Sequence, residues 1–286
     1  MAIIVAPLLV FGGYFTAILA IILLAGGVYE FLHIKRKANM EPIPIFYYII
    51  SYIFAFFFIF GLPINGNSFD YKDAMMLGII NNYDLIYLIS FLLITLAMPV
   101  FSKKVNIMDA VYTFTTTLYL SFGVKGLLYV RSLGGVDNSK YGLFMVLYLL
   151  IVTCFTDIFA YFGGMLCYKI LGEDKVHKLN ERISAKKTIE GTIIGTLFAT
   201  VSGFIFGYFL INSIDGVNHS WYFYLLTSFI LSLAGQLGDL ILSANKRYYG
   251  IKDYSNLLPG HGGILDRIDS LIANSMMFAI IIFTFI

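Results

Sequence analysis

The chain has 286 residues, of which 59% are hydrophobic and only 13% are charged, and its formal net charge is +2. Soluble globular proteins carry about 25% charged residues, so this composition excludes an ordinary soluble enzyme, a disordered chain and a nucleic-acid-binding protein with a basic face. The remaining class is an all-α, polytopic helical membrane protein.

Eight apolar runs in the sequence are long enough to cross the hydrocarbon core of a bilayer, which is about 30 Å thick. In chain order they cover approximately residues 3–32, 43–62, 85–101, 108–130, 141–168, 188–211, 221–242 and 264–286. Gly123, Lys125 and Gly126 interrupt the fourth run, which leaves a ninth, re-entrant segment open there. The sequence therefore predicts about eight transmembrane helices.

The basic residues gather in alternate loops. Fourteen Lys and Arg residues lie in the loops 33–42, 102–107, 169–187 and 243–263, whereas the loops 63–84, 131–140 and 212–220 hold three. Cytoplasmic loops of membrane proteins are enriched in Lys and Arg, so the four basic loops are expected in the cytoplasm and both chain ends outside. Glu30 and His33 stand just before the first basic loop and are expected at the membrane interface.

A polar stripe follows the seventh apolar run. On an α-helix, six of its polar side chains fall within an arc of about 100°. These are Ser232, Gln236, Asp239, Ser243, Lys246 and Arg247. A solvated helix end explains Lys246 and Arg247, but it does not explain Gln236 or Asp239 deeper in the run. Carboxylates within a membrane are rare and usually functional, so the stripe predicts a polar funnel that opens to the cytoplasm.

A glycine-rich turn leads into the eighth run. It consists of Gly260, His261, Gly262 and Gly263. The glycines permit close backbone approach, and the helix N-terminus that follows attracts phosphate. Asp266 and Asp269 come next and share a helix face, with Arg267 between them. Carboxylates beside phosphates imply a cation and describe a Mg²⁺ site, although a tight structural turn is the alternative for the glycines alone.

A third polar cluster lies in the fifth run and the basic loop after it. Asp157 and Tyr161 share one helix face in that run. The loop ends with Ser184, Lys186 and Lys187 immediately before the sixth run, where two lysines can hold a triphosphate as point charges. The alternatives are an ion pair between helices for Asp157 and ordinary loop topology for the lysines.

The segment from Ser243 to Asp269 resembles the signature of the phosphatidate cytidylyltransferase (CDP-diacylglycerol synthase) family, S-x-x-K-R-x4-K-D-x-S-x-x-L-P-G-H-G-G-x-x-D-R-x-D. Two upstream segments are similar to the family as well. Residues 157–161 match its D-x-x-A-Y element, and residues 184–191 match S-P-K-K-T-x-E-G except that Ala185 replaces the proline. The resemblance covers approximately residues 140–286.

The resemblance implies that CTP and phosphatidate react to give CDP-diacylglycerol and pyrophosphate, with Mg²⁺ as cofactor and a second cation left open. The implied catalytic residues are Asp239, Lys246, Arg247, Asp266 and Asp269, of which the three aspartates would be metal ligands. The implied substrate-binding residues are Asp157, Tyr161, Ser184, Lys186, Lys187, Gln236, Ser243, His261, Gly262, Gly263 and Arg267.

The expected organisation follows from the apolar runs, the loop bias and the resemblance together. Residues 1–135 would form N-terminal spans, and residues 136–286 would form the C-terminal catalytic region with its cytoplasmic loops. The protein would be a multi-pass protein of the cell membrane with its active site facing the cytoplasm. Its partners would be CTP, phosphatidate and the lipid bilayer, with a homodimer left open and no nucleic acid.

The sequence leaves two other functions open. One is a related CTP-dependent lipid kinase or a cytidylyltransferase for a prenyl lipid, which would share the fold. The other is a membrane transporter that uses the intramembrane Asp157 and Asp239. An inverted repeat would favour the transporter, and none is evident in the sequence.

The loop bias makes a prediction about orientation. A cysteine placed at Ser184 or Asp253 should react with an impermeant thiol reagent only from the cytoplasmic side, because both lie in basic loops. A cysteine placed at Asp215 should react only from outside. The opposite pattern of labelling in inverted and right-side-out vesicles would contradict the orientation.

Overall fold

The computed structural model describes residues 12–61, 82–102, 105–135, 139–172, 175–257, 260 and 262–285. The chain divides into two compact units. Unit 1 comprises Met1–Ser132 and Tyr249–Ile268, and unit 2 comprises Leu133–Tyr248 and Asp269–Ile286. The segment from Tyr249 to Ile268, which carries much of the signature, therefore belongs to the unit that contains the N-terminal helices.

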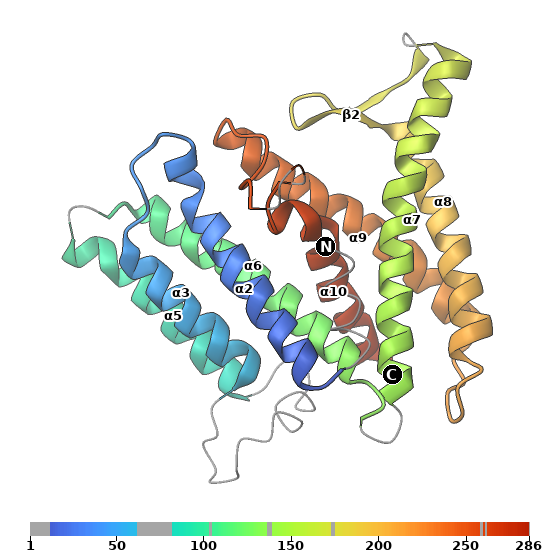
Figure 1. The fold of residues 1–286 in the computed structure, drawn as a ribbon, viewed down its shortest axis with the longest axis horizontal. Helices are drawn as coiled ribbons and strands as arrows, with labels where there is room; N and C mark the ends of the chain where they lie inside the picture. The colour runs from blue at the N-terminus through green and yellow to red at the C-terminus, as the bar shows by residue number, and fades with distance from the viewer. Residues whose placement is uncertain are drawn as a thin grey trace. The chain divides into compact units, whose positions relative to one another are not determined.

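Within the described residues, unit 1 is framed by four helices (Figure 1). They are α2 (Tyr14–Lys37), α3 (Ile45–Phe60), α5 (Asn82–Phe101) and α6 (Ile107–Ser132). Helix α6 contacts the other three and presents polar groups to them: Lys125 forms a buried ion pair with Asp84 of α5, and Thr117 donates a hydrogen bond to Ser51 of α3. Helix α6 is continuous from Ile107 to Ser132, so the re-entrant segment that the sequence left open near Gly123 is not formed.

Unit 2 is built around α7 (Ser139–Leu171) and α8 (Ile189–Ile205), which lie side by side (Figure 1). A π-helix, η2 (Phe206–Ile211), continues α8, and α9 (Trp221–Tyr248) packs on both α7 and α8. Helix α10 (Leu265–Phe285) belongs to this unit from Asp269 onward. Its Asn274 donates a hydrogen bond to Thr153 of α7.

The one departure from the all-helical prediction is a β-hairpin of strands β1 (Lys178–Asn180) and β2 (Ser184–Thr188), the sole sheet found in the described residues. The sequence showed this segment only as a basic loop. Strands of three and five residues are too short to give a recognisable alternation of polar and apolar residues. The hairpin lies at one end of α7 and α8 (Figure 1).

Six helices in the described part of the chain are long and apolar enough to cross a membrane. They are Tyr14–Lys37, Tyr83–Phe101, Lys140–Leu171, Ile189–Ile211, Trp221–Tyr248 and Leu265–Phe285. Helix α3 is apolar but has only 16 residues, and the polar α6 is not among the six. Each predicted run therefore contains a helix, and the polytopic helical class is confirmed, whereas the exact number of spans stays a prediction.

Small residues let α7 and α8 approach each other closely. A Cβ atom added at Gly191 would lie 2.5 Å from the carbonyl oxygen of Ala160, and one added at Gly195 would lie 2.6 Å from the carbonyl oxygen of Thr156. Close packing of this kind is a main source of helix association in lipid, where apolar side chains gain little by leaving the hydrocarbon.

The Gly195→Val substitution should therefore destabilise unit 2. The added methyl groups must push α8 away from the α7 backbone, and overpacking of this kind costs about 1–3 kcal/mol. The measurement is the thermal midpoint of the purified protein in detergent. The matched control is Leu197→Val, because Leu197 lies on the same helix with 61% of its surface exposed. Equal midpoints for both variants would contradict the close helix contact.

Candidate active site

The basic hairpin of unit 2 is held in place at its turn. Its strands are antiparallel, with Lys178 opposite Thr188. In the turn, the side-chain oxygen of Asn180 accepts a hydrogen bond from the Ile183 N–H at 3.2 Å. Arg247 of α9 donates from Nε to the Ile183 carbonyl at 3.2 Å. A residue that the sequence assigned to catalysis therefore fastens the hairpin to α9 in this structure.

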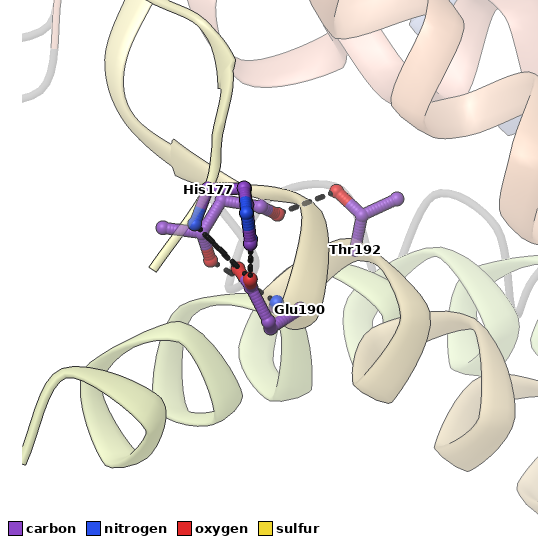
Figure 2. A network of polar contacts seen from close by, with 5 residues as sticks. His177, Glu190 and Thr192 are labelled. Atoms are coloured by element: carbon purple, nitrogen blue, oxygen red, sulfur yellow. Dashed lines mark hydrogen bonds and ion pairs between the residues drawn. The ribbon is translucent and has the colours of Figure 1, made fainter. Parts of the chain in front are cut away.

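The base of the hairpin is fastened to the first turn of α8 (Figure 2). The backbone N–H of His177 donates to the Glu190 carboxylate at 3.0 Å, and its ring Nδ1 lies 2.8 Å from the same oxygen. The Thr188 hydroxyl accepts from the Gly191 N–H and so caps the helix. Thr192 donates to the Thr188 carbonyl. These contacts fix the direction in which β2 enters α8 and thus where its lysines lie.

A cavity of about 510 Å³ lies where α7, the hairpin, α8 and α9 meet. A cavity of this size suits a small-molecule substrate. Its polar and aromatic lining comprises Asp157, Tyr161, Tyr168, Lys178, Lys186, Lys187, Thr188, Thr192, Gln236 and Asp239. Carboxylates and ammonium groups thus share one cavity wall, which is the arrangement needed to receive phosphates together with a cation.

The central contact of this cavity is the ion pair between Lys187 of the hairpin and Asp239 of α9. Ser243, one turn further along α9, donates a hydrogen bond to the other Asp239 oxygen at 3.1 Å. The two side chains of the pair remain 30% and 20% exposed. An ion pair that water reaches is weak, so a phosphate can take over Lys187 and a cation can take over Asp239 at small cost.

Two further carboxylates of unit 2 lie close to Asp239. Asp157 of α7 and Asp269 of α10 both interact electrostatically with Asp239. Lys187 supplies opposing charge to Asp157, and Lys246 supplies it to Asp269. Three carboxylates predicted from separate segments therefore lie close enough to interact with one another, and Lys187 and Lys246 lie near them.

The cavity reaches Gln236 but not Ser232. Gln236 lines the cavity and donates from Nε2 to the Thr196 hydroxyl at 2.9 Å. Ser232 is fully buried and is hydrogen-bonded to the hydroxyls of Thr156 and Thr196. The members of the polar stripe on α9 therefore differ in their surroundings: Ser232 joins three helices, whereas Gln236 and Asp239 line the cavity.

The remaining predicted residues of unit 2 lie as follows. Tyr161 lines the cavity and is 66% exposed, and Lys186 lines it from β2. Ser184 begins β2 and is half-buried. Lys178 also lines the cavity, although the sequence showed it only as one of six loop cations. Its ammonium lies 4.9 Å from the centre of the Tyr168 ring.

The signature residues of unit 1 form a separate network. Asp266 accepts hydrogen bonds at Oδ2 from the N–H groups of Tyr254 and Gly263, at 2.8 and 2.9 Å. Gly262 has a φ of 80°, which favours glycine, and Arg267 is exposed. His261 lies outside the described residues. Asp239 belongs to unit 2, so the expected binding of one cation by Asp239 and Asp266 together stays a prediction.

Glu30, whose position at the membrane interface stays a prediction, is buried within unit 1. Its side chain is only 1% exposed, and it accepts hydrogen bonds from the N–H groups of Ile264 and Leu265 at the start of α10. A helix start has unpaired N–H groups that need an acceptor, and a carboxylate of α2 meets this need. The signal in the sequence was an acidic residue at the end of an apolar run.

The donor chemistry of the cavity fits Mg²⁺. Within the described ranges, no three His, Cys, Asp or Glu side chains lie close enough together to form a complete metal cage. Mg²⁺ seldom uses such a cage, because it keeps several waters and is held by one or two carboxylates plus substrate phosphates. Asp239, partly exposed in a cavity that lysines also line, has the donor chemistry for this role.

Comparison with known proteins bears on the identity of the chain. The model of the cytidylyltransferase family matches residues 1–285. The chain belongs to the cytidylyltransferase family. This assignment agrees with the resemblance found in the signature segment.

Individual relatives agree with the family. A phosphatidate cytidylyltransferase of Staphylococcus haemolyticus (strain JCSC1435) is 37% identical over 192 residues, which are 67% of this chain and 66% of that protein. A protein of the same name from Staphylococcus aureus (strain COL) is 38% identical over 184 residues, which are 64% of this chain and 63% of that protein. The match thus spans just under two thirds of the length of these relatives.

The depth of the cavity makes a prediction about water access. In a chain with Cys154→Ala and Cys167→Ala, a Gln236→Cys variant should react with a small, charged methanethiosulfonate, because Gln236 lines the cavity. The matched variant is Leu237→Cys, whose native side chain is 58% exposed on an apolar face of α9 and should react only with a lipid-soluble reagent. Equal reactivity of both thiols toward the charged reagent would contradict the conclusion that the cavity extends to Gln236.

Proposed function

We propose that the protein is a phosphatidate cytidylyltransferase, which converts CTP and phosphatidate to CDP-diacylglycerol and pyrophosphate. The observation that carries the proposal is the cavity of unit 2, where Lys187 pairs with Asp239 beside Lys178, Lys186 and Asp157. The cavity is cut into a bundle of apolar helices, so a water-soluble triphosphate and a lipid can meet there. The names of the relatives support this substrate pair.

The chemistry asks mainly for positioning. An oxygen of the lipid phosphate attacks the α-phosphorus of CTP, the bond from that phosphorus to the bridging oxygen of the β-phosphate breaks, and pyrophosphate leaves with the electron pair. A phosphate monoester is largely dianionic near neutral pH, so the attacking oxygen needs no base. Lys186 and Lys187 hold the triphosphate and compensate its charge, and Ser243 keeps the Asp239 carboxylate oriented.

Mg²⁺ is the proposed cofactor, and a second cation stays a prediction. When bound, Mg²⁺ neutralises charge on the phosphates of CTP and on the leaving pyrophosphate. Asp239 would hold it, with Asp266 and Asp269 as the further ligands expected from the signature. Asp239 and Lys187, which pair with each other in this structure, would then pair with the cation and with the triphosphate, respectively.

Phosphatidate is proposed to enter from the lipid side. Tyr161 borders the cavity on α7, and Ile158 and Phe162 beside it are 47% and 54% exposed. Apolar side chains next to a charged cavity allow the acyl chains to stay in the hydrocarbon while the phosphate reaches the lysines. The enzyme would be a multi-pass protein of the cell membrane with this cavity toward the cytoplasm, and a homodimer stays a prediction.

The proposal is tested by product analysis with the purified protein in lipid–detergent micelles. CTP and Mg²⁺ are supplied with phosphatidate, diacylglycerol or a prenyl alcohol in parallel, and pyrophosphate and lipid products are measured. Formation of CDP-diacylglycerol with phosphatidate alone is the expected result. Phosphorylation of diacylglycerol or of the prenyl alcohol would identify a kinase. A protein that consumes no CTP with any of the three lipids would contradict the proposal.

The Asp239→Asn substitution should reduce turnover by about 10²–10³-fold, the usual cost of removing one group that stabilises charge in the transition state. The amide preserves the size of the side chain, so the thermal midpoint in detergent should change little. The matched control is Asp215→Asn, because Asp215 is exposed in the loop before α9. Near-normal turnover of Asp239→Asn at ordinary Mg²⁺ would exclude Asp239 as a metal ligand.

A further inference from the structure

We propose that Glu30 is a positioning residue for catalysis, which sets the turn before α10 and thereby the backbone that carries Asp266; this inference rests on the function proposed above. Glu30 belongs to α2, far from the signature in the sequence. Glu30 and the turn before α10 both belong to unit 1.

The Glu30 carboxylate makes three hydrogen bonds to the signature segment. Oε1 accepts from the Ser255 hydroxyl at 2.6 Å and from the Ile264 N–H at 2.8 Å. Oε2 accepts from the Leu265 N–H at 2.8 Å. Glu30 is only 1% exposed, so these donors replace the water that a carboxylate would otherwise bind, and the start of α10 adds a favourable dipole. One carboxylate thus joins both ends of the turn, Ser255 before it and the helix start after it.

Gly263 shows how closely this turn is fitted around the carboxylate. A Cβ atom added at Gly263 would lie 2.5 and 2.6 Å from the two oxygens of Glu30. The Gly263 N–H donates to Asp266 Oδ2 at 2.9 Å, and the Tyr254 N–H donates to the same atom. Glu30 and Asp266 therefore hold opposite sides of one short backbone segment, and movement of that segment moves the Asp266 carboxylate.

Other residues of α2 extend the same contact. The Phe31 ring meets the Tyr254 ring edge-on, with centroids 5.5 Å apart, and Lys37 donates from Nζ to the Asp253 carbonyl at 2.6 Å. Gly26 is covered by the Ile264 side chain. One face of α2 thus follows the signature segment from Asp253 to the start of α10, and Glu30 is the charged group at its centre.

Loss of the Glu30 charge should affect rate more than binding or stability. In Glu30→Gln the amide oxygen can still accept one of these hydrogen bonds. The amide NH₂ group cannot accept the other, so the backbone N–H that faces it must move away. A misplacement of about 1 Å in a catalytic group can cost on the order of 10²-fold in rate. The KM for CTP should change less than kcat, because the lysines proposed to hold the triphosphate are in the hairpin of unit 2.

The experiment compares Glu30→Gln with the matched control Glu41→Gln, an exposed acid in the loop after α2. Three quantities are measured on the full chain in detergent: kcat and KM for CTP, the thermal midpoint, and hydrogen exchange of peptides covering residues 254–268. For Glu30→Gln the expected result is a fall in kcat on the order of 10²-fold, a smaller change in KM, a thermal midpoint near that of wild type and faster exchange in residues 262–266. Glu41→Gln should match the wild type throughout.

Two results for kcat would overturn the proposal. One is an unchanged kcat in Glu30→Gln, and the other is a fall in kcat that only follows the folded fraction and is recovered at low temperature, because Glu30 would then serve stability alone. Failure of the proposed function looks different, since the wild-type chain itself would make no CDP-diacylglycerol. Unchanged exchange in residues 262–266 of Glu30→Gln would overturn the role of Glu30 whether or not the wild type is active.

Discussion

The free-energy cost of placing a charge among apolar helices determines how each charged side chain of this protein is surrounded. A charged side chain in a membrane must be paired, hydrogen-bonded or kept in contact with water. The structure uses all three solutions: Lys125 and Asp84 are buried together, Glu30 is surrounded by backbone donors, and Asp239 keeps Lys187 beside an open cavity. The last solution is the one that leaves a charge available for chemistry.

The same constraint explains why the three lysines that line the cavity lie on a β-hairpin rather than on a transmembrane helix. A lysine on a helix face would need a permanent partner in the apolar interior. The hairpin instead projects its lysines from a short polar segment that is fastened at its base by Glu190 and at its turn by Arg247. Two fixed ends give the lysines defined positions although the strands are only three and five residues long.

The sequence predicted the helices well, because a long apolar run has few other structures open to it in lipid. It also placed Asp157, Tyr161, Lys186, Lys187, Gln236 and Asp239 in a common site, and the structure brings these residues to one cavity. It missed the hairpin, whose strands are short and polar. It also missed Glu30, because a hydrogen bond to a backbone N–H leaves no trace in the identity of the partner residue, and the partner lies 235 residues away in the sequence.

That sequence distance matters for how the protein is made. The N-terminal helix emerges from the ribosome and enters the membrane long before the turn that it holds has been synthesised. The contacts of Glu30 with Ser255 and Leu265 span 225 and 235 residues, so they can form only after the chain has been synthesised as far as Leu265. Contacts so distant are among the slowest to form in folding, and a nascent chain would therefore assemble its lipid-embedded helices first and close the signature turn last. Shortened chains that still insert into the membrane would lack this final closure.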